Sequence, residues 1–242
     1  MRKRLPLVGV LAGVLVAVLA GCGRTSPPPQ PTPTPLTMEQ ATDSLLGYLH
    51  DRYGEDFTCV KISHAPDGFG WPQPGTFLMH ARVSGATHEY DTFTVEWRGD
   101  DPWDNYLLVK MRPGYQASAD QILPSVYSEY FMRVELNGAV RDLPGDITES
   151  DFHSWATDNL SVSITVVLPH SEGATQESVD TEAAPLESQL SGFLAKSVEM
   201  TLNYYPTSIY ESKRDLFFAS DIETLRDMTK NRDFLVLFSQ RG

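Results

Sequence analysis

Helical spacing of apolar residues is clearest at the start of the region expected to fold. Thr37-Met38-Glu39-Gln40 matches a capping box, and apolar residues then recur every three or four positions. Gly54 ends this run, and glycine closes many helices because it readily adopts the left-handed conformation. A helix is therefore predicted from Met38 to Tyr53.

Alternation with a period of two predicts the strands, because successive side chains of a strand point to opposite faces. The predicted strands are 57–63, 77–83, 89–97, 132–136, 162–168, 198–204 and 234–238, with a turn at 84–87.

Further helices are predicted from apolar spacing and from capping residues. They cover 115–130, which Pro124 should kink or shorten, 148–158, 186–194 and a short segment opening at Ser220-Asp221-Ile222-Glu223. The polar, acidic stretch 171–181 is predicted to be a flexible loop.

This order of elements favours an α+β fold, because strands and helices mix without strict βαβ alternation. We expect a mainly antiparallel sheet packed with several helices. Turn-forming residues Gly138, Pro144 and Gly145 mark a boundary between a first half, 37–140, and a second half, 146–242. The two halves are either separate domains or one continuous domain.

The chain begins with a segment typical of export. Residues 2–4 are basic and residues 5–20 are almost entirely apolar, a run shorter than a membrane-spanning helix needs. Leu19-Ala20-Gly21-Cys22 then resembles the lipobox of bacterial lipoproteins, in which the cysteine receives lipid and the signal peptide is cut in front of it. The alternative is an ordinary cleaved signal with an incidental cysteine.

Residues 1–21 are accordingly predicted to be a lipoprotein signal peptide, and residues 22–36 a lipidated cysteine followed by a linker. Alternating prolines between 27 and 35 favour a polyproline II spacer. Two acyl chains anchor stably, so the domain should stay on the outer face of the cytoplasmic membrane, or on its periplasmic side in a Gram-negative cell.

Composition agrees with a folded, acidic domain. Hydrophobic residues make up 41% of the chain, and without the signal peptide 16 basic residues face 32 acidic ones, a formal net charge of −16. This charge argues against nucleic acid and anionic lipid surfaces, and leaves a basic partner or a cation open. Cys59 is the one cysteine left for the domain, so no disulfide can form within it, and its place in a strand pattern indicates a buried structural thiol.

Two segments resemble parts of a known group. Residues 48–60 read as a helix that ends in Tyr-Gly-Glu and is followed by a strand, and Asp104-Asn105-Tyr106-Leu107 precedes the predicted helix that contains Tyr115. This arrangement is similar to uncharacterised membrane-anchored lipoproteins of Gram-positive bacteria. The resemblance implies no activity, cofactor or catalytic residue.

Motifs for enzyme chemistry are missing from the sequence. His88-Glu89-Tyr90-Asp91-Thr92 has threonine where a zinc protease has its second histidine. No lysine follows a serine by three positions, and no Gly-x-Ser-x-Gly occurs. No catalytic residue and no cofactor are therefore predicted.

Two loops contain candidate ligand contacts. Asp100, Asp101 and Asp104 group carboxylates, but they lack the alternating order and the terminal glutamate of calcium loops, so a solvated acidic turn is the better interpretation. Aromatic candidates for ligand contact are Phe69, Trp71 and Trp103, and packing of these rings on the core is the competing interpretation.

Three function classes remain on this reading. The leading hypothesis is a non-enzymatic interaction or sensing module with a protein or cell-wall partner. A cell-wall hydrolase is the runner-up, since paired carboxylates can meet in space without any sequence motif. The solute-binding component of a transporter comes third, because such receptors are usually larger than this chain and consist of repeated βαβ units.

Overall fold

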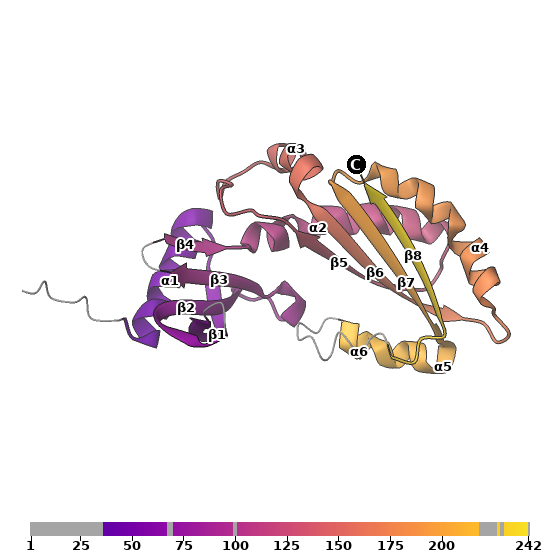
Figure 1. Cartoon of the computed structure of the whole chain (residues 1–242), viewed down its shortest axis with the longest axis horizontal. Coiled ribbons are helices and arrows are strands. Elements are labelled where there is room, and N and C mark those ends of the chain that lie inside the picture. The colour runs from indigo at the N-terminus through magenta and orange to yellow at the C-terminus, as the bar shows by residue number, and fades with distance from the viewer. Residues whose placement is uncertain (1–35, 67–69, 99–100, 218–226, 228–229, 242) are drawn as a thin grey trace, which may run out of the picture. The chain divides into compact units, whose positions relative to one another are not determined.

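The structure is a computed structural model that describes residues 36–66, 70–98, 101–217, 227 and 230–241 (Figure 1). Residues 35–242 form one compact unit. Among the described residues, every helix is too short or too polar to span a bilayer. The predicted signal peptide, the lipobox, the proline-rich linker before Leu36 and the capping box at 220–223 lie outside the described residues.

The predicted first helix is confirmed as α1 (Met38–Tyr53). The Thr37 hydroxyl accepts a hydrogen bond from the backbone N–H of Gln40, the Gln40 side chain accepts one in return, and Gly54 follows with φ of 67°. Its buried residues Ala41, Leu45 and Leu49 form one stripe. That stripe packs on the first sheet, so the amphipathic pattern determines how α1 docks.

The first sheet is an antiparallel meander in the order β1-β2-β3-β4. Its strands are β1 (Phe57–Pro66), β2 (Pro72–Val83), β3 (Phe93–Arg98) and β4 (Asp101–Asp104). The buried face presents Phe77, Met79, Phe93 and Val95 to α1, and Tyr106 completes this small core. Cys59 on β1 packs at the edge of the core and is half-buried, less enclosed than the predicted structural thiol.

The second sheet is mixed, in the order β5-β6-β7-β8. Its strands are β5 (Phe131–Asn137), β6 (Ser161–His170), β7 (Ser197–Pro206) and β8 (Phe234–Arg241). The β6–β7 pair is parallel, whereas β5–β6 and β7–β8 are antiparallel. Within the described residues the two sheets are therefore mainly antiparallel and packed with helices, which confirms the predicted α+β class.

Helices cover the second sheet on both sides. The larger core lies between one face and α2 (Tyr106–Ile122), α3 (Glu149–Asn159) and α4 (Gln176–Glu187). Figure 1 shows α2 behind the strands and α4 beside β8. On the other face, Tyr210 of α5 (Thr207–Tyr210) stacks on Phe131, and Arg214 of α6 (Arg214–Phe217) lies over the same ring.

The segment predicted as a boundary packs against α1. Arg52 donates hydrogen bonds to the carbonyl oxygens of Arg141, at 3.2 Å, and Leu143, and a Cβ on Gly145 would collide with the Arg52 backbone. The change from one sheet to the other comes earlier in the chain, along α2, because β5 already belongs to the second sheet.

Several element predictions are corrected by the structure. The helix predicted from residue 115 begins at Tyr106 and ends at Ile122, before Pro124. Residues 176–181, predicted to be loop, open α4, and the helix predicted over 186–194 ends at Glu187 and continues as a 3-10 turn. Residues 89–91 form the 3-10 turn η1 rather than the start of a strand, and 101–104 form strand β4 rather than loop.

Candidate functional site

Tyr90 connects the two sheets and forms one wall of the candidate site. It lies on η1, which precedes β3, and its hydroxyl donates to the carbonyl oxygen of Val134 on β5. The same hydroxyl accepts a hydrogen bond of 2.9 Å from the Val134 N–H. Burial raises the pKa of Tyr90, and the charges of Arg112 and Arg133 offset part of that rise. The phenol is therefore a neutral, fixed contact between the sheets.

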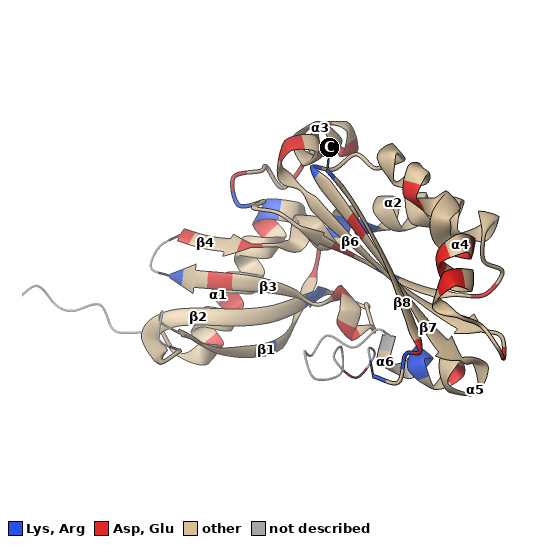
Figure 2. Ribbon diagram, turned by 45° about the vertical axis from the view of Figure 1, so that its right-hand side comes forward, with Lys and Arg blue, Asp and Glu red and all other residues tan. Residues whose placement is uncertain are grey.

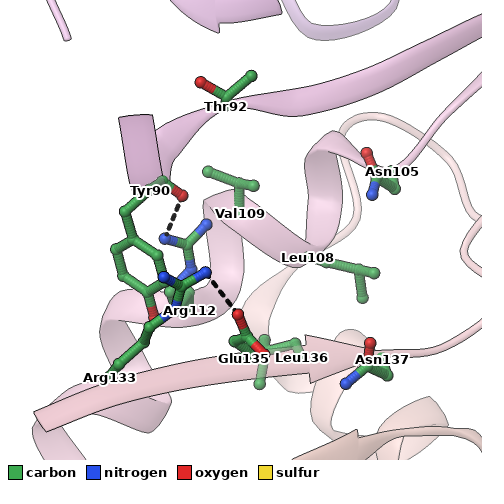
Figure 3. Close-up of a pocket in the computed structure, with 10 residues that line it drawn as sticks. All are labelled: Tyr90, Thr92, Asn105, Leu108, Val109, Arg112, Arg133, Glu135, Leu136 and Asn137. Carbon is green, nitrogen blue, oxygen red and sulfur yellow. Dashed lines mark hydrogen bonds and ion pairs between the residues drawn. The ribbon is translucent and has the colours of Figure 1, made fainter. Parts of the chain in front are cut away.

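Two guanidinium groups lie on the Tyr90 ring (Figure 3). The Arg112 Cζ is 3.8 Å from the ring centroid and the Arg133 Cζ is 4.5 Å away. Both residues are buried, at 8% and 7% exposed. A guanidinium over a tyrosine face is stabilised by the ring quadrupole, most strongly where water is excluded. Tyr90 thus holds both cations in defined positions.

Each arginine has an acidic neighbour. The Arg112 Nη1 donates to the carbonyl oxygen of Tyr90 at 2.9 Å and lies 3.5 Å from Oδ1 of Asp91. The Arg133 Nη2 lies 2.6 Å from Oε1 of Glu135, on the same strand. Since burying an unpaired charge is costly, these carboxylates help to stabilise two arginines at this depth.

Tyr90, Arg112, Arg133 and Glu135 line a cavity of about 230 Å³ between β5 and α2. Its wall contains Tyr90, Thr92, Asn105, Leu108, Val109, Arg112, Arg133, Glu135, Leu136 and Asn137 (Figure 3). A second cavity of about 260 Å³ adjoins it and shares Tyr90, Val109 and Arg112. The asparagine amides are drawn at the end of the first cavity away from Tyr90 (Figure 3).

The chemistry that this arrangement supports is recognition of a polar ligand. Arginine stays protonated at every physiological pH, so Arg112 and Arg133 can attract an anionic group but cannot act as a general base. The Tyr90 hydroxyl is engaged by the backbone of Val134. Acidic residues are spread over α1, α3 and α4 (Figure 2), which makes two buried arginines at one cavity an unusual local charge in this chain.

A separate polar network lies where the two segments of the sequence resemblance meet. Asp104 is buried and accepts hydrogen bonds from Tyr48, at 2.8 Å, from Tyr53, at 2.7 Å, and from the Tyr106 N–H, at 2.8 Å. Glu55 accepts from the Tyr106 hydroxyl at 2.6 Å. All three tyrosine hydroxyls donate to these two carboxylates, whereas the Arg52 Nε, 3.8 Å from Oδ2 of Asp104, is buried without a hydrogen-bond partner among the described residues. The network therefore joins α1 to β4 through buried polar contacts.

The two described carboxylates of the weak calcium alternative, Asp101 and Asp104, are engaged by different partners. Asp104 is committed to that network, Asp101 pairs with Arg141, and Asp100 lies outside the described residues. No three acidic, histidine or cysteine side chains in the described part of the chain are placed to hold an ion. The physical reason is that Asp101 and Asp104 lie on strand β4, where Asp104 faces α1.

The aromatic candidates are also dispersed. Trp71 adjoins β2 and is 72% exposed, and Trp103 is half-buried on edge strand β4. Neither lines the cavities beside Tyr90, and Phe69 lies outside the described residues. The residues that do line them, Tyr90, Arg112 and Arg133, come from three separate segments and were not singled out from the sequence. One signal was available, because Arg112 occupies a buried position of the helical pattern between Leu108 and Tyr115.

Comparison with known proteins shows a similarity that concerns the fold. No protein-family model matches the sequence, and no curated protein matches it at a significant level. A crystal structure of a DUF5037 family protein from Ruminococcus gnavus is similar, with a TM-score of 0.57 over 83% of this chain and 91% of that one, at 12% identity. The likeness is one of fold alone. It brings no substrate or site residue to this chain.

Proposed function

We propose that this protein is an extracytoplasmic lipoprotein, tethered by lipid on Cys22, whose folded domain is a non-enzymatic binding module. The observation that carries the binding function is the pair of buried arginines stacked on Tyr90 at the wall of an open cavity. The anchor is supported by the basic start, the short apolar run and the Leu-Ala-Gly-Cys sequence.

The runner-up, a cell-wall hydrolase, needs two carboxylates that flank a scissile bond. Each of the two cavities beside Tyr90, and each of the two on α3 and α4, has a single acidic residue in its wall. Among the described residues, the buried carboxylates are Glu96 and Asp104. They point to opposite faces of the first sheet, because Asp104 lies opposite Val95 whereas Glu96 lies opposite Trp103. These observations favour binding over hydrolysis.

The anchor is tested by labelling cells that express the full chain with a palmitate analogue. We expect the wild type and Cys59→Ser to take up label and to sediment with membranes. Cys22→Ser should do neither, because the thiol that receives the lipid is lost. Cys59→Ser is the matched control, since Cys59 is the other cysteine of the chain. Equal sedimentation of Cys22→Ser and wild type without label would overturn the lipoprotein proposal.

The non-enzymatic part of the proposal is tested on the purified full chain. Incubation with cell-wall fragments and with peptides should release no product, while a compound that fits the cavity should raise the melting temperature. Product formation that Arg112→Lys abolishes would replace the binding function with an enzymatic one at this site.

A further inference from the structure

The outer edge of the Arg112 guanidinium is available to a ligand. Nη1 donates the described hydrogen bonds of this group. No residue in the described part of the chain accepts a hydrogen bond from Nε or Nη2. Arg112 is 8% exposed, and neither nitrogen is among the buried side-chain atoms left without a partner in the described part of the chain. Nε and Nη2 direct two parallel N–H bonds from one edge of the guanidinium, which matches the two oxygens of a carboxylate.

This edge is held in place before any ligand arrives. The guanidinium plane rests on the Tyr90 ring, 3.8 Å from its centroid, and the ring is fixed by both backbone groups of Val134. A group that is already ordered loses little conformational entropy on binding. The Arg112 edge therefore has the rigidity of a binding site, unlike an arginine on the surface.

Charges around Tyr90 select the kind of ligand. Arg112 and Arg133 contribute two positive charges, and Asp91 and Glu135 contribute two negative ones. A ligand with a net charge would leave one charge uncompensated in a partly buried site, which is costly. Neutral ligands and ligands with one charge of each sign both leave the balance unchanged, and only the second kind can pair with the charged groups of both Arg112 and Glu135.

Glu135 offers the second contact. Its Oε1 pairs with Arg133 at 2.6 Å, and among the described residues no donor is assigned to its Oε2. Its side chain is 45% exposed and lines the same cavity as Arg112. A carboxylate oxygen in this position can accept a hydrogen bond from an ammonium group.

Size and lining limit the ligand further. The cavity holds about 230 Å³, below the roughly 300 to 1,000 Å³ that is usual for drug-sized ligands. Asn105 lines the cavity, and because its Oδ1 accepts a hydrogen bond of 2.7 Å from the Thr94 N–H, its side chain has the amide N–H groups left as donors. The site thus fits a compact molecule with polar groups at both ends.

We infer that this cavity binds a small zwitterionic α-amino acid, with its carboxylate on Nε and Nη2 of Arg112 and its ammonium group on Glu135. The inference rests on the binding function proposed above and adds the ligand class to it.

Calorimetric titration of the full-length lipidated protein in detergent tests this ligand class. Glycine, L-alanine and D-alanine present both charges, whereas acetate and methylamine each present one. We expect the three amino acids to bind. Each half ligand should bind about tenfold more weakly or worse, because it forfeits a charged hydrogen bond.

Three variants separate the two contacts. Arg112→Lys keeps the charge but loses the parallel N–H pair, and should weaken glycine binding by about tenfold or more. Glu135→Gln should weaken glycine binding while leaving acetate binding unchanged or tighter, a result that simple misfolding would not produce. Arg141→Lys, at the surface pair with Asp101, is the matched control and should bind like wild type.

The outcomes also separate this inference from the proposed function. Acetate that binds as tightly as glycine, in an Arg112-dependent manner, overturns the zwitterion and keeps the binding module. If none of the five compounds binds, the inference is overturned, and cell-wall fragments and peptides are then titrated into the same protein. Arg112-dependent binding of one of these keeps the proposed function, and its absence ends it.

Discussion

The hydroxyl of Tyr53 donates a 2.7 Å hydrogen bond to Oδ1 of Asp104, although 51 residues separate the two. Tyr53 is the last residue of α1, and Asp104 is the last residue of β4. Their contact joins the end of the first helix to the far edge of the first sheet. The Tyr-Gly-Glu sequence is thereby explained, because Gly54 closes the helix and Glu55 binds the Tyr106 hydroxyl and Lys110.

Asp104→Ala should destabilise the protein strongly. The substitution leaves the hydroxyls of Tyr48 and Tyr53 and the N–H of Tyr106 without their acceptor in a buried site. We expect the free energy of unfolding to fall by about 3 kcal/mol or more, measured by urea denaturation. Asp101→Ala on the same strand is the control, since its carboxylate is 74% exposed and should contribute about 1 kcal/mol or less. Equal effects of the two variants would contradict the structural role of Asp104.

Stability should decline at alkaline pH. Burial and the charge of Glu149 raise the pKa of Tyr115 from 10.0 to about 12, and burial also raises the pKa of Tyr127 to about 12. Between pH 10 and pH 12 the unfolded chain loses these protons while the folded chain keeps them, so stability is present below pH 10 and falls as the pH rises. Urea denaturation at pH 8, 10 and 11, followed by tyrosinate absorbance, measures this. Tyr115→Phe should make the decline shallower.

Gly145→Ala and Gly47→Ala should act in opposite directions. A Cβ on Gly145 would overlap the backbone carbonyl of Arg52, so one element must shift, at a cost of about 1 to 3 kcal/mol. Gly47 lies inside α1 with open space around it, so alanine there should stabilise the helix by about 0.5 to 1 kcal/mol. Thermal melting of both variants decides this. A neutral Gly145→Ala would show that the contact between α1 and the 141–145 segment is loose.

Tyr90→Phe separates the two roles of Tyr90. Phenylalanine retains a ring for Arg112 and Arg133 but cannot bond the backbone of Val134. We expect a loss of about 1 to 2 kcal/mol in stability, measured by urea denaturation, from the unpaired Val134 N–H. Tyr90→Ala also removes the surface on which the guanidinium groups stack, and should weaken ligand binding in the titrations far more than Tyr90→Phe does.

Much of the fold is visible in the sequence where one periodicity dominates. The strand over 162–168 alternates cleanly, and the helix from Met38 has a capping box at its start and Gly54 at its end. The start of α2 at Tyr106 was missed because Pro113-Gly114 reads as a turn, although both lie within the helix. The first part of α4 was missed because its exposed residues dominate, with only Val179, Ala183 and Leu186 buried.

The candidate site was invisible for a different reason. Tyr90, Arg112 and Arg133 are 21 or more residues apart in the chain, and only tertiary packing brings them together. In the sequence, Arg133 is a polar residue in an alternating strand, which predicts a solvent-facing side chain. Nothing in the pattern indicates that this side chain packs on Tyr90. Asp101 and Asp104 were predicted to lie in a solvated acidic turn, whereas they lie on strand β4, where a spacing of three residues places them on opposite faces.

The position of β8 as the last strand of the second sheet in sequence order has a consequence for the order in which the domain folds. The first sheet uses only strands between Phe57 and Asp104, so it can pair as soon as that stretch has emerged. The second sheet lacks its edge strand until β8 (Phe234–Arg241) pairs with β7. The parallel β6–β7 pair forms only after the long crossover between these two strands has closed. A chain in which β8 has not yet paired therefore exposes the β7 edge, and that intermediate is the one most open to aggregation.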